Sequence, residues 1–177
     1  MTILIIIVGP SGTGKSTLAQ SFISEHNICE ADTYPGLYNN GMICHELLQN
    51  AHEACKRKVE HFMKQKEDTI VQSNTNLDLG EKGLKSYIQL AQFYNYEVHI
   101  ILPCYDLLHF ESNYTTRQSQ LDFISSQRSS GTKIVPMTSI IRMVNQYDII
   151  KPRLLQLAQT TDPYQMIQML STFLYIK

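Results

Sequence analysis

Residues 9–16 have the types and the spacing that phosphate chemistry requires. The segment fits the P-loop pattern G-x-x-x-x-G-K-[ST] at every fixed position. Its members are Gly9, Pro10, Ser11, Gly12, Thr13, Gly14, Lys15 and Ser16. The glycines let such a loop fold back so that its N–H groups point at one phosphate chain. Lys15 supplies a point charge for the β and γ phosphates, and Ser16 is placed to bind Mg²⁺. The segment therefore predicts binding of ATP, or of another nucleoside triphosphate, together with magnesium.

The residues on either side give the loop its required setting. Residues 2–8 form a β-branched and aliphatic run that ends at the first glycine, which is typical of a strand buried on both faces. Residues 15–24 suit a helix, whose N-terminus adds roughly half a positive charge at the same spot. Thr17 then lies beside the α-phosphate or simply begins the helix, and both interpretations stay open. Because switches, motors and small kinases share the P-loop, it identifies the nucleotide and leaves the reaction open.

A carboxylate follows the second predicted strand, at residues 27–31. In an open parallel sheet, ligands gather outside the carboxyl ends of the strands, so we expect Asp32 to lie across from Lys15. A carboxylate there accepts the proton of an attacking hydroxyl and orients it toward the γ-phosphate. We therefore predict Asp32 as the general base, with a turn cap as the alternative. Glu30 is a fallback, although alternation along a strand turns its side chain to the opposite face.

The third predicted strand, at residues 69–72, ends without the acid that motors and switches use to hold magnesium. No Asp or Glu occurs between Ile70 and Leu77, which weighs against a hydrolytic ATPase. Asn74 and Asn76 stand there instead, as neutral donors and acceptors suited to a phosphate or a sugar. We predict substrate contacts for both, with an Asx-type turn that opens the next helix as the equal alternative.

Helical and extended segments alternate along the first part of the chain. Residues 42–66 have apolar positions at three- to four-residue spacing, which predicts one long amphipathic helix. A helix over 81–94 and a strand over 97–102 follow. Strands that alternate with helices indicate a parallel sheet covered on both faces. The predicted fold is α/β, a three-layer sandwich whose mostly parallel sheet has four or five strands.

After residue 103 the sequence becomes more polar and mainly helical. A helix is expected from 136 to about 146, with weaker helical segments to the end. No linker separates these parts, so we expect one domain with a helical lid at about 104–135. Residues 1–147 form the predicted core, lid included, and residues 148–177 form a helical extension packed on it.

The composition limits the choice of partners. The 177 residues include 15 Lys and Arg against 16 Asp and Glu, a net charge of −1. Broad, sequence-independent binding of nucleic acid needs many phosphate contacts and a basic stripe, so this balance argues against it but allows a grip on one strand end. The four cysteines have no CxxC spacing, no secretory leader precedes the fold, and the N-terminal apolar run is too short to span a bilayer. We expect an intracellular protein, cytoplasmic or nuclear, with reduced thiols and no membrane contact.

In the order of these motifs, the chain resembles the P-loop polynucleotide 5′-kinase family known from bacteriophages. The likeness covers roughly residues 3–147 and is greatest in residues 73–77, which read SNTNL, and 131–136, which read GTKIVP. It implies a P-loop kinase-like fold and transfer of the γ-phosphate of ATP to a 5′-hydroxyl of DNA or RNA, a reaction of nucleic acid repair. Asp32 falls on that family's base, and the P-loop lysine and serine fall on its phosphate and magnesium residues.

Two positions near the predicted base depart from that family. The family's pair of acids after the second strand appears here as Asp32-Thr33, so one carboxylate is missing. Thr33 keeps its place beside the expected acceptor and is predicted to contact the substrate. Asn74 stands where the phage enzyme has an aspartate. Both replacements leave the predicted acceptor side with one acid.

The resemblance also implies an arginine in the lid, directly before GTK, where this chain has Ser130. Arg128, two residues earlier, is the nearest substitute, and Arg117 and Lys133 are further candidates to reach inward. We predict Arg128 as the cation that neutralises the transferring phosphoryl group, with a solvated surface charge as the alternative. Residues 104–117 make a longer stretch than the family needs, which indicates a reshaped lid.

These features predict an ATP-dependent phosphotransferase, a polynucleotide 5′-hydroxyl kinase, whose partner is a nucleic-acid 5′ end. Two alternatives stay open. A kinase of a nucleotide, nucleoside or other small metabolite would use the same core, and the low net basicity favours it. A catalytically weak nucleotide-binding module is the other alternative, favoured by the missing second acid and the displaced arginine. A homo-oligomer is neither required nor excluded.

Overall fold

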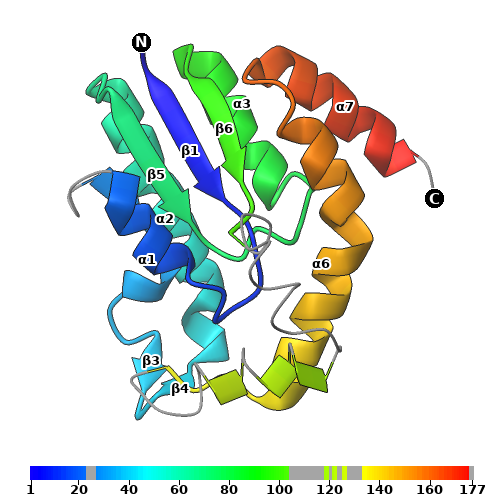
Figure 1. Ribbon diagram of the computed structural model, residues 1–177. Coiled ribbons are helices and arrows are strands. Elements are labelled where there is room, and N and C mark those ends of the chain that lie inside the picture. The colour runs from blue at the N-terminus through cyan, green and yellow to red at the C-terminus, as the bar shows by residue number, and fades with distance from the viewer. Residues whose placement is uncertain (23–26, 104–117, 120, 123–124, 127–132, 176–177) are drawn as a thin grey trace.

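The computed structural model describes residues 1–22, 27–103, 118–119, 121–122, 125–126 and 133–175 (Figure 1). At its centre is a parallel sheet with the strand order β2-β5-β1-β6. The strands are β1 (Ile3–Ile7), β2 (Ile28–Cys29), β5 (Thr69–Ser73) and β6 (Glu97–Ile101). The predicted α/β fold is confirmed, with four strands in its parallel sheet.

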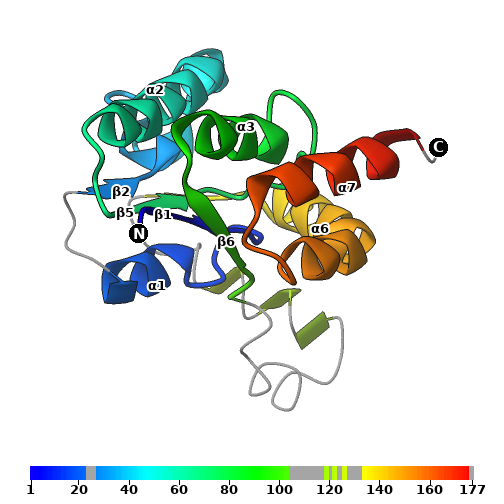
Figure 2. The same cartoon turned by 90° about the horizontal axis from the view of Figure 1, so that it is seen from above.

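Helices cover both faces of this sheet, which makes three layers (Figure 2). The helices nearest to the sheet are α1 (Lys15–Phe22) on one face, and α2 (His45–Lys64) and α3 (Leu84–Tyr94) on the other. Leu4 and Ile6 of β1 belong to the core under α2 and α3. Ile5 and Ile7 point the other way and pack with Ala19 of α1. The unbroken apolar run of β1 is therefore explained by burial on both faces.

A β-hairpin that the sequence did not predict shortens the helix expected over residues 42–66. β4 (Met42–Ile43) pairs antiparallel with β3 (Tyr38–Asn39), and α2 begins only after it. Asn40 and Gly41, between the two strands, have positive φ angles of 49° and 79°, as a two-residue type I′ turn requires. The sequence indicates the turn, but strands of two residues are too short to show an alternating pattern.

The helix α6 (Met137–Leu157) is longer than the helix predicted from 136 to about 146. Its buried stripe continues past that point to Leu154 and beyond, because the spacing of the apolar residues stays helical. The helix carries Pro152 in its interior. The expected division between residues 147 and 148 falls inside this helix.

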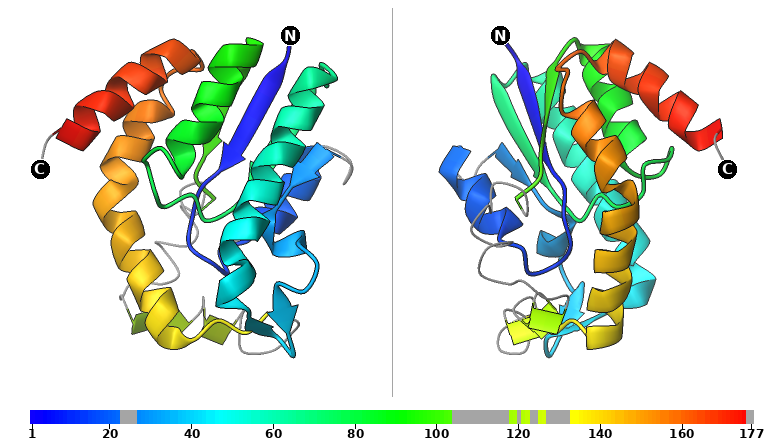
Figure 3. Two further views of the ribbon diagram at one scale, coloured as in Figure 1. Left: turned by 180° about the vertical axis from the view of Figure 1, so that it is seen from behind. Right: turned by 45° about the vertical axis from the view of Figure 1, so that its right-hand side comes forward.

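The helix α7 (Pro163–Tyr175) packs on α3 and also contacts α6 (Figure 3). Met166 and Leu170 of α7 are fully buried in the same core as the strands. The C-terminal residues therefore belong to the main core. Over the part of the chain that the structure describes, no helix has the length and apolarity needed to cross a bilayer.

We expect the C-terminal half of α6 to stabilise the whole domain. Leu154→Ala removes a fully buried side chain and should lower the free energy of unfolding by about 2–5 kcal/mol. The adjacent Leu155 is 38% exposed, so Leu155→Ala should change that free energy by less than about 0.5 kcal/mol. Chemical denaturation of both variants measures the difference. Equal, small effects would contradict a core that is continuous through α6.

Candidate active site

The P-loop connects β1 to α1 and is closed on itself through one carbonyl. Lys15 Nζ donates to the carbonyl of Pro10 at 2.7 Å, and Thr13 Oγ1 donates to the same oxygen at 2.9 Å. Gly12 and Gly14 have φ angles of 86° and 81°, which residues with a side chain rarely adopt. Lys15 is only 9% exposed. Because a buried ammonium is costly without anionic or polar partners, this loop suits a phosphate group that would share Lys15 with Pro10.

Ser16 and Thr17 stand exposed on the first turn of α1. This end of the helix carries partial positive charge and points its free N–H groups outward. Both hydroxyls are therefore accessible to a nucleotide at the loop. Since α1 begins at Lys15, Thr17 belongs to the helix, and its contact with an α-phosphate stays a prediction.

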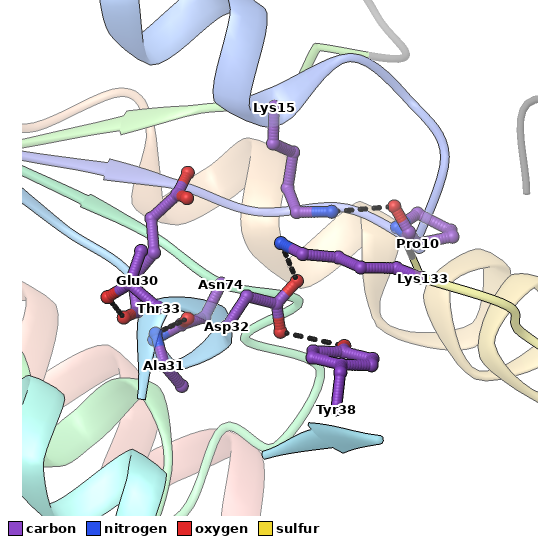
Figure 4. A network of polar contacts seen from close by, with 9 residues as sticks. All are labelled: Pro10, Lys15, Glu30, Ala31, Asp32, Thr33, Tyr38, Asn74 and Lys133. Carbon is purple, nitrogen blue, oxygen red and sulfur yellow. Dashed lines mark hydrogen bonds and ion pairs between the residues drawn. The ribbon is translucent and has the colours of Figure 1, made fainter. Parts of the chain in front are cut away.

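Asp32 lies on η2 (Ala31–Thr33), the 3-10 turn that follows β2. Tyr38 Oη donates to Asp32 Oδ1 at 3.1 Å, and Lys133 Nζ donates to Asp32 Oδ2 at 3.0 Å (Figure 4). The Lys133 ammonium also lies 5.5 Å from the centre of the Tyr38 ring. Thr33 is exposed, and its hydroxyl donates to the backbone carbonyl of Glu30 at 2.8 Å. Both oxygens of the predicted base are thus engaged by neighbouring side chains.

Of the three cations considered for the lid, Lys133 is the one that lies within the described residues. Arg117 and Arg128 lie outside them. The backbone next to Lys133 is held in place, because Ile134 N–H donates to the carbonyl of Gly41 in the β3–β4 turn at 2.7 Å. The chain that leads into α6 accordingly passes this hairpin (Figure 1).

Asn74 and Asn76 hold the ends of the two strands that flank β5. Asn74 Oδ1 accepts the N–H of Ala31 at 2.9 Å, directly before Asp32. Asn76 Nδ2 donates to the carbonyl of Ile7 at 3.1 Å, at the end of β1, and the amide also exchanges hydrogen bonds with Gln72. The asparagines are only 7% and 8% exposed. A substrate contact through either amide stays a prediction, and it would have to share these hydrogen bonds.

Glu30 and Ser73 lie at the same edge of the sheet but on its other face. The pairing of β2 with β5 ends at Cys29 and Gln72. The residues that follow this pair, Glu30 and Ser73, are therefore neighbours on the α1 side of the sheet. Figure 4 shows the Glu30 carboxylate pointing away from Asp32. Strand alternation is not the reason, because a period of two would place positions 30 and 32 on the same face. The 3-10 turn that begins at Ala31 ends the extended backbone and turns Asp32 the other way. Glu30 Oε1 and Ser73 Oγ are buried and have no hydrogen-bond partner among the described residues. Unpaired buried oxygens are costly, so this spot suits a polar ligand.

Two thiols form part of the wall behind Asp32. Burial raises the pKa of Cys29, and the neighbouring thiol of Cys55 raises it further. Burial also raises the pKa of Cys55, which a hydrogen bond from Asn74 Nδ2 to Cys55 Sγ at 3.4 Å offsets in part. Both thiols are therefore protonated at neutral pH and are poor nucleophiles. This leaves the carboxylate of Asp32 as the candidate base on this side of the site.

The residue pattern agrees with a known family. A family model described as an AAA domain (AAA_33) matches residues 4–128, which include the P-loop, Asp32 and β5. The chain belongs to this family. Its domain is P-loop kinase-like, so the family resemblance and the fold predicted from the sequence are confirmed.

Solved structures also resemble the chain, and 14 of their chains match it. One comes from "Structure of the Pnkp1/Rnl/Hen1 RNA repair complex", with a TM-score of 0.55 and 17% sequence identity. The alignment covers 86% of this chain and 46% of that chain, so this chain spans about half the length of the chain it matches. At this identity the likeness establishes the fold. Among curated proteins, none matches.

The place of Lys15 inside the loop gives a direct test of nucleotide binding. Lys15→Ala removes the charge that would meet the β and γ phosphates and should weaken ATP binding at least tenfold, about 1.4 kcal/mol. The matched control is Lys64→Ala, on the last turn of α2, where the side chain is 60% exposed and pairs with Glu60. Isothermal titration calorimetry should show unchanged affinity for the control. Equal affinities of the two variants would exclude Lys15 from the binding site.

Proposed function

We propose that this chain transfers the γ-phosphate of ATP, or of another nucleoside triphosphate, to the 5′-hydroxyl of a DNA or RNA strand. The observation that carries the proposal is the placement of Lys15 and Asp32 at one edge of the sheet, with their polar ends directed into the same region (Figure 4). A phosphate-binding loop and a carboxylate across from it are the parts that phosphoryl transfer to an alcohol requires. The P-loop kinase-like family and the fold shared with a chain of an RNA repair complex support this reaction class.

In the proposed reaction, the loop amides and Lys15 bind the β- and γ-phosphates of the donor. Asp32 accepts the proton of the 5′-hydroxyl while the hydroxyl oxygen attacks the γ-phosphorus. The bond from the γ-phosphorus to the bridging oxygen breaks, and ADP leaves with that oxygen. Catalysis then consists of positioning and charge neutralisation. Arg128 stays the sequence-based proposal for a lid cation on the transferring group.

The carboxyl end of β5 supports transfer to an alcohol over hydrolysis. Many P-loop ATPases and switches have an acid there, whereas this chain has Ser73 and Asn74. Asn74 is engaged with the backbone of Ala31. The acid proposed as the base, Asp32, instead follows β2, on the side where an acceptor would enter.

Magnesium is the ion that the family implies for such a donor, and oxygens of this chain fit it. Mg²⁺ binds through one or two protein oxygens, substrate phosphates and several waters. Ser16 would supply a hydroxyl ligand. The buried oxygens of Glu30 and Ser73, which lack partners among the described residues, would accept hydrogen bonds from waters on the ion. When bound, the ion neutralises charge on the β- and γ-phosphate oxygens.

A small acceptor is the second candidate. The charge balance of 15 basic and 16 acidic side chains favours a nucleotide, nucleoside or other metabolite, since it provides no excess of phosphate contacts. A weakly catalytic nucleotide-binding module is the third, because Asp32 is engaged by Tyr38 and Lys133. Labelled ATP offered with 5′-hydroxyl oligonucleotides and with nucleosides separates the first two. ATP binding without transfer to any acceptor would support the third.

Asp32→Asn tests the proposed base. The amide keeps the shape of the side chain but cannot accept the proton, so we expect kcat to fall by about 10²–10⁴-fold with ADP affinity unchanged. Asp68→Asn is the matched control, at an exposed position before β5, and should leave kcat unchanged. The measurement is transfer of labelled phosphate to a 5′-hydroxyl oligonucleotide. Undiminished turnover in Asp32→Asn would remove Asp32 from the mechanism.

Glu30→Gln tests the proposed magnesium environment without relying on turnover. The change removes the charge of a side chain with a buried, unpartnered oxygen, so Mn²⁺, used as a paramagnetic substitute, should bind the ADP complex about 10–100-fold more weakly. Glu53→Gln, on the exposed side of α2, should have no effect. Electron paramagnetic resonance of free Mn²⁺ gives both affinities. Equal Mn²⁺ affinity in the two variants would exclude Glu30 from the metal environment.

A further inference from the structure

We propose that Lys133 is a cation with two positions: it pairs with Asp32 when no triphosphate is bound, and it moves to the γ-phosphate when ATP binds, which uncovers Asp32 for the acceptor. The inference rests on the proposed kinase function and assigns to it a residue and a conformational step. Three features of the site lead to it: the engaged carboxylate, the held backbone beside Lys133, and the side of Asp32 on which the Lys133 ammonium lies.

The first feature is that Asp32 is occupied on both oxygens. Lys133 Nζ lies 3.0 Å from Oδ2, and Tyr38 Oη lies 3.1 Å from Oδ1. A general base must present an oxygen to the hydroxyl that loses its proton. Tyr38 is a neutral donor that orients the carboxylate and can stay. The charged Lys133 takes one acceptor position of the other oxygen, so its departure would open that position to an acceptor hydroxyl.

The second feature is a held backbone with a movable side chain. Ile134 N–H donates to the carbonyl of Gly41 at 2.7 Å, which fixes the chain beside Lys133 to the β3–β4 turn. The Lys133 side chain is 25% exposed and that of Asp32 is 39% exposed, so water screens their ion pair and makes it weak. A lysine ammonium on a flexible four-carbon stem can change partners more easily than an arginine, whose planar fork favours one paired geometry. The side chain of Lys133 can therefore rotate to another partner while the backbone beside it stays in place.

The third feature is the second partner that the Lys133 ammonium would meet, the γ-phosphate of a nucleotide at the P-loop. Figure 4 shows the Lys133 ammonium on the side of Asp32 that faces Lys15 and Pro10. Lys15 marks the place of the β- and γ-phosphates in a P-loop. A terminal phosphate carries more charge than a single carboxylate and offers three acceptor oxygens, so it competes well for an ammonium. ADP lacks that group and would leave Lys133 on Asp32.

A double-mutant cycle on nucleotide affinity tests this step without turnover. The probes are ADP and an ATP analogue with an imide between the β- and γ-phosphates, each titrated with magnesium into the wild-type chain, Lys133→Ala, Asp32→Ala and the double variant. Lys133→Ala should weaken binding of the analogue about tenfold and that of ADP less than twofold. Asp32→Ala should tighten binding of the analogue, because Lys133 no longer has a competing partner. In the Lys133→Ala background, that gain should shrink by about threefold or more.

Each other outcome speaks against the proposal. If the effects of the two substitutions on affinity for the analogue are additive, Lys133 does not move between Asp32 and the γ-phosphate. If Lys133→Ala weakens ADP and the analogue equally, or lowers only the melting temperature, Lys133 has a general or structural role. Lys133→Gln and Asp32→Asn repeat the cycle where an alanine variant does not fold. Failure of the wild-type chain to bind either nucleotide would overturn the proposed function itself, which distinguishes that case.

Discussion

The strand β5 lies between the strand that leads into the P-loop and the strand that leads to Asp32, and its end holds both. Neighbouring strands lie about 4.8 Å apart, so the ends of β1 and β2 are about 10 Å apart, with room for a phosphoryl group and an alcohol. Asn76 donates to the carbonyl of Ile7, and Asn74 accepts the N–H of Ala31. Without either amide, a backbone group at the end of a strand would lose a hydrogen-bond partner. The separation of donor and base thus depends on this pair of asparagines.

A neutral residue suits position 74. Asn74 accepts a hydrogen bond from Ala31 N–H and donates one to Cys55 Sγ. An amide can do both, whereas an ionised carboxylate only accepts. The surroundings also disfavour charge, because burial raises the pKa of Cys29 and of Cys55. The departure from the aspartate of the phage kinase family therefore has a local physical reason, and Asp32 is left as the acid on this face.

The parts of the structure that the sequence predicts are those whose determinants are contiguous. The P-loop combines a buried strand, glycines with positive φ and a helix start within a few residues, so its position and its backbone conformation follow from the motif. The opposite directions of Glu30 and Asp32 in Figure 4 do not follow from strand alternation, which would place positions 30 and 32 on one face; they come from the 3-10 turn after β2. The β3–β4 hairpin lies below the length at which a pattern is visible. The end of α6 is hidden by Pro152, which normally indicates the end of a helix.

The residues around Asp32 come from distant parts of the chain. Lys133 meets Asp32 across 101 positions of sequence, and no spacing rule relates them. Tyr38 is one of 10 tyrosines and is distinguished only by the hairpin that carries it. Asn74 and Asn76 attract attention as polar residues after a strand, yet each also bonds a backbone group of another element, Ala31 N–H in η2 and the Ile7 carbonyl at the end of β1. Local sequence can therefore locate the P-loop and a candidate acid, whereas the way this acid is held and covered is set by tertiary contacts.

The two sides of the site differ in stiffness, and this difference suits phosphoryl transfer. The P-loop and the turn of Asp32 are tied to β5 by buried amides, which would hold the proposed reacting groups in line at little entropic cost. Lys133 is held through the backbone of the adjacent Ile134, and its side chain pairs with Asp32 where water reaches both. In the proposed mechanism, the rigid P-loop and the turn of Asp32 fix the position of the attacking oxygen. The movement of Lys133 determines when Asp32 becomes accessible to it. In the proposed ADP state, Asp32 stays paired with Lys133. The binding of ATP brings the γ-phosphate that attracts Lys133, and this step frees Asp32 to act as the base.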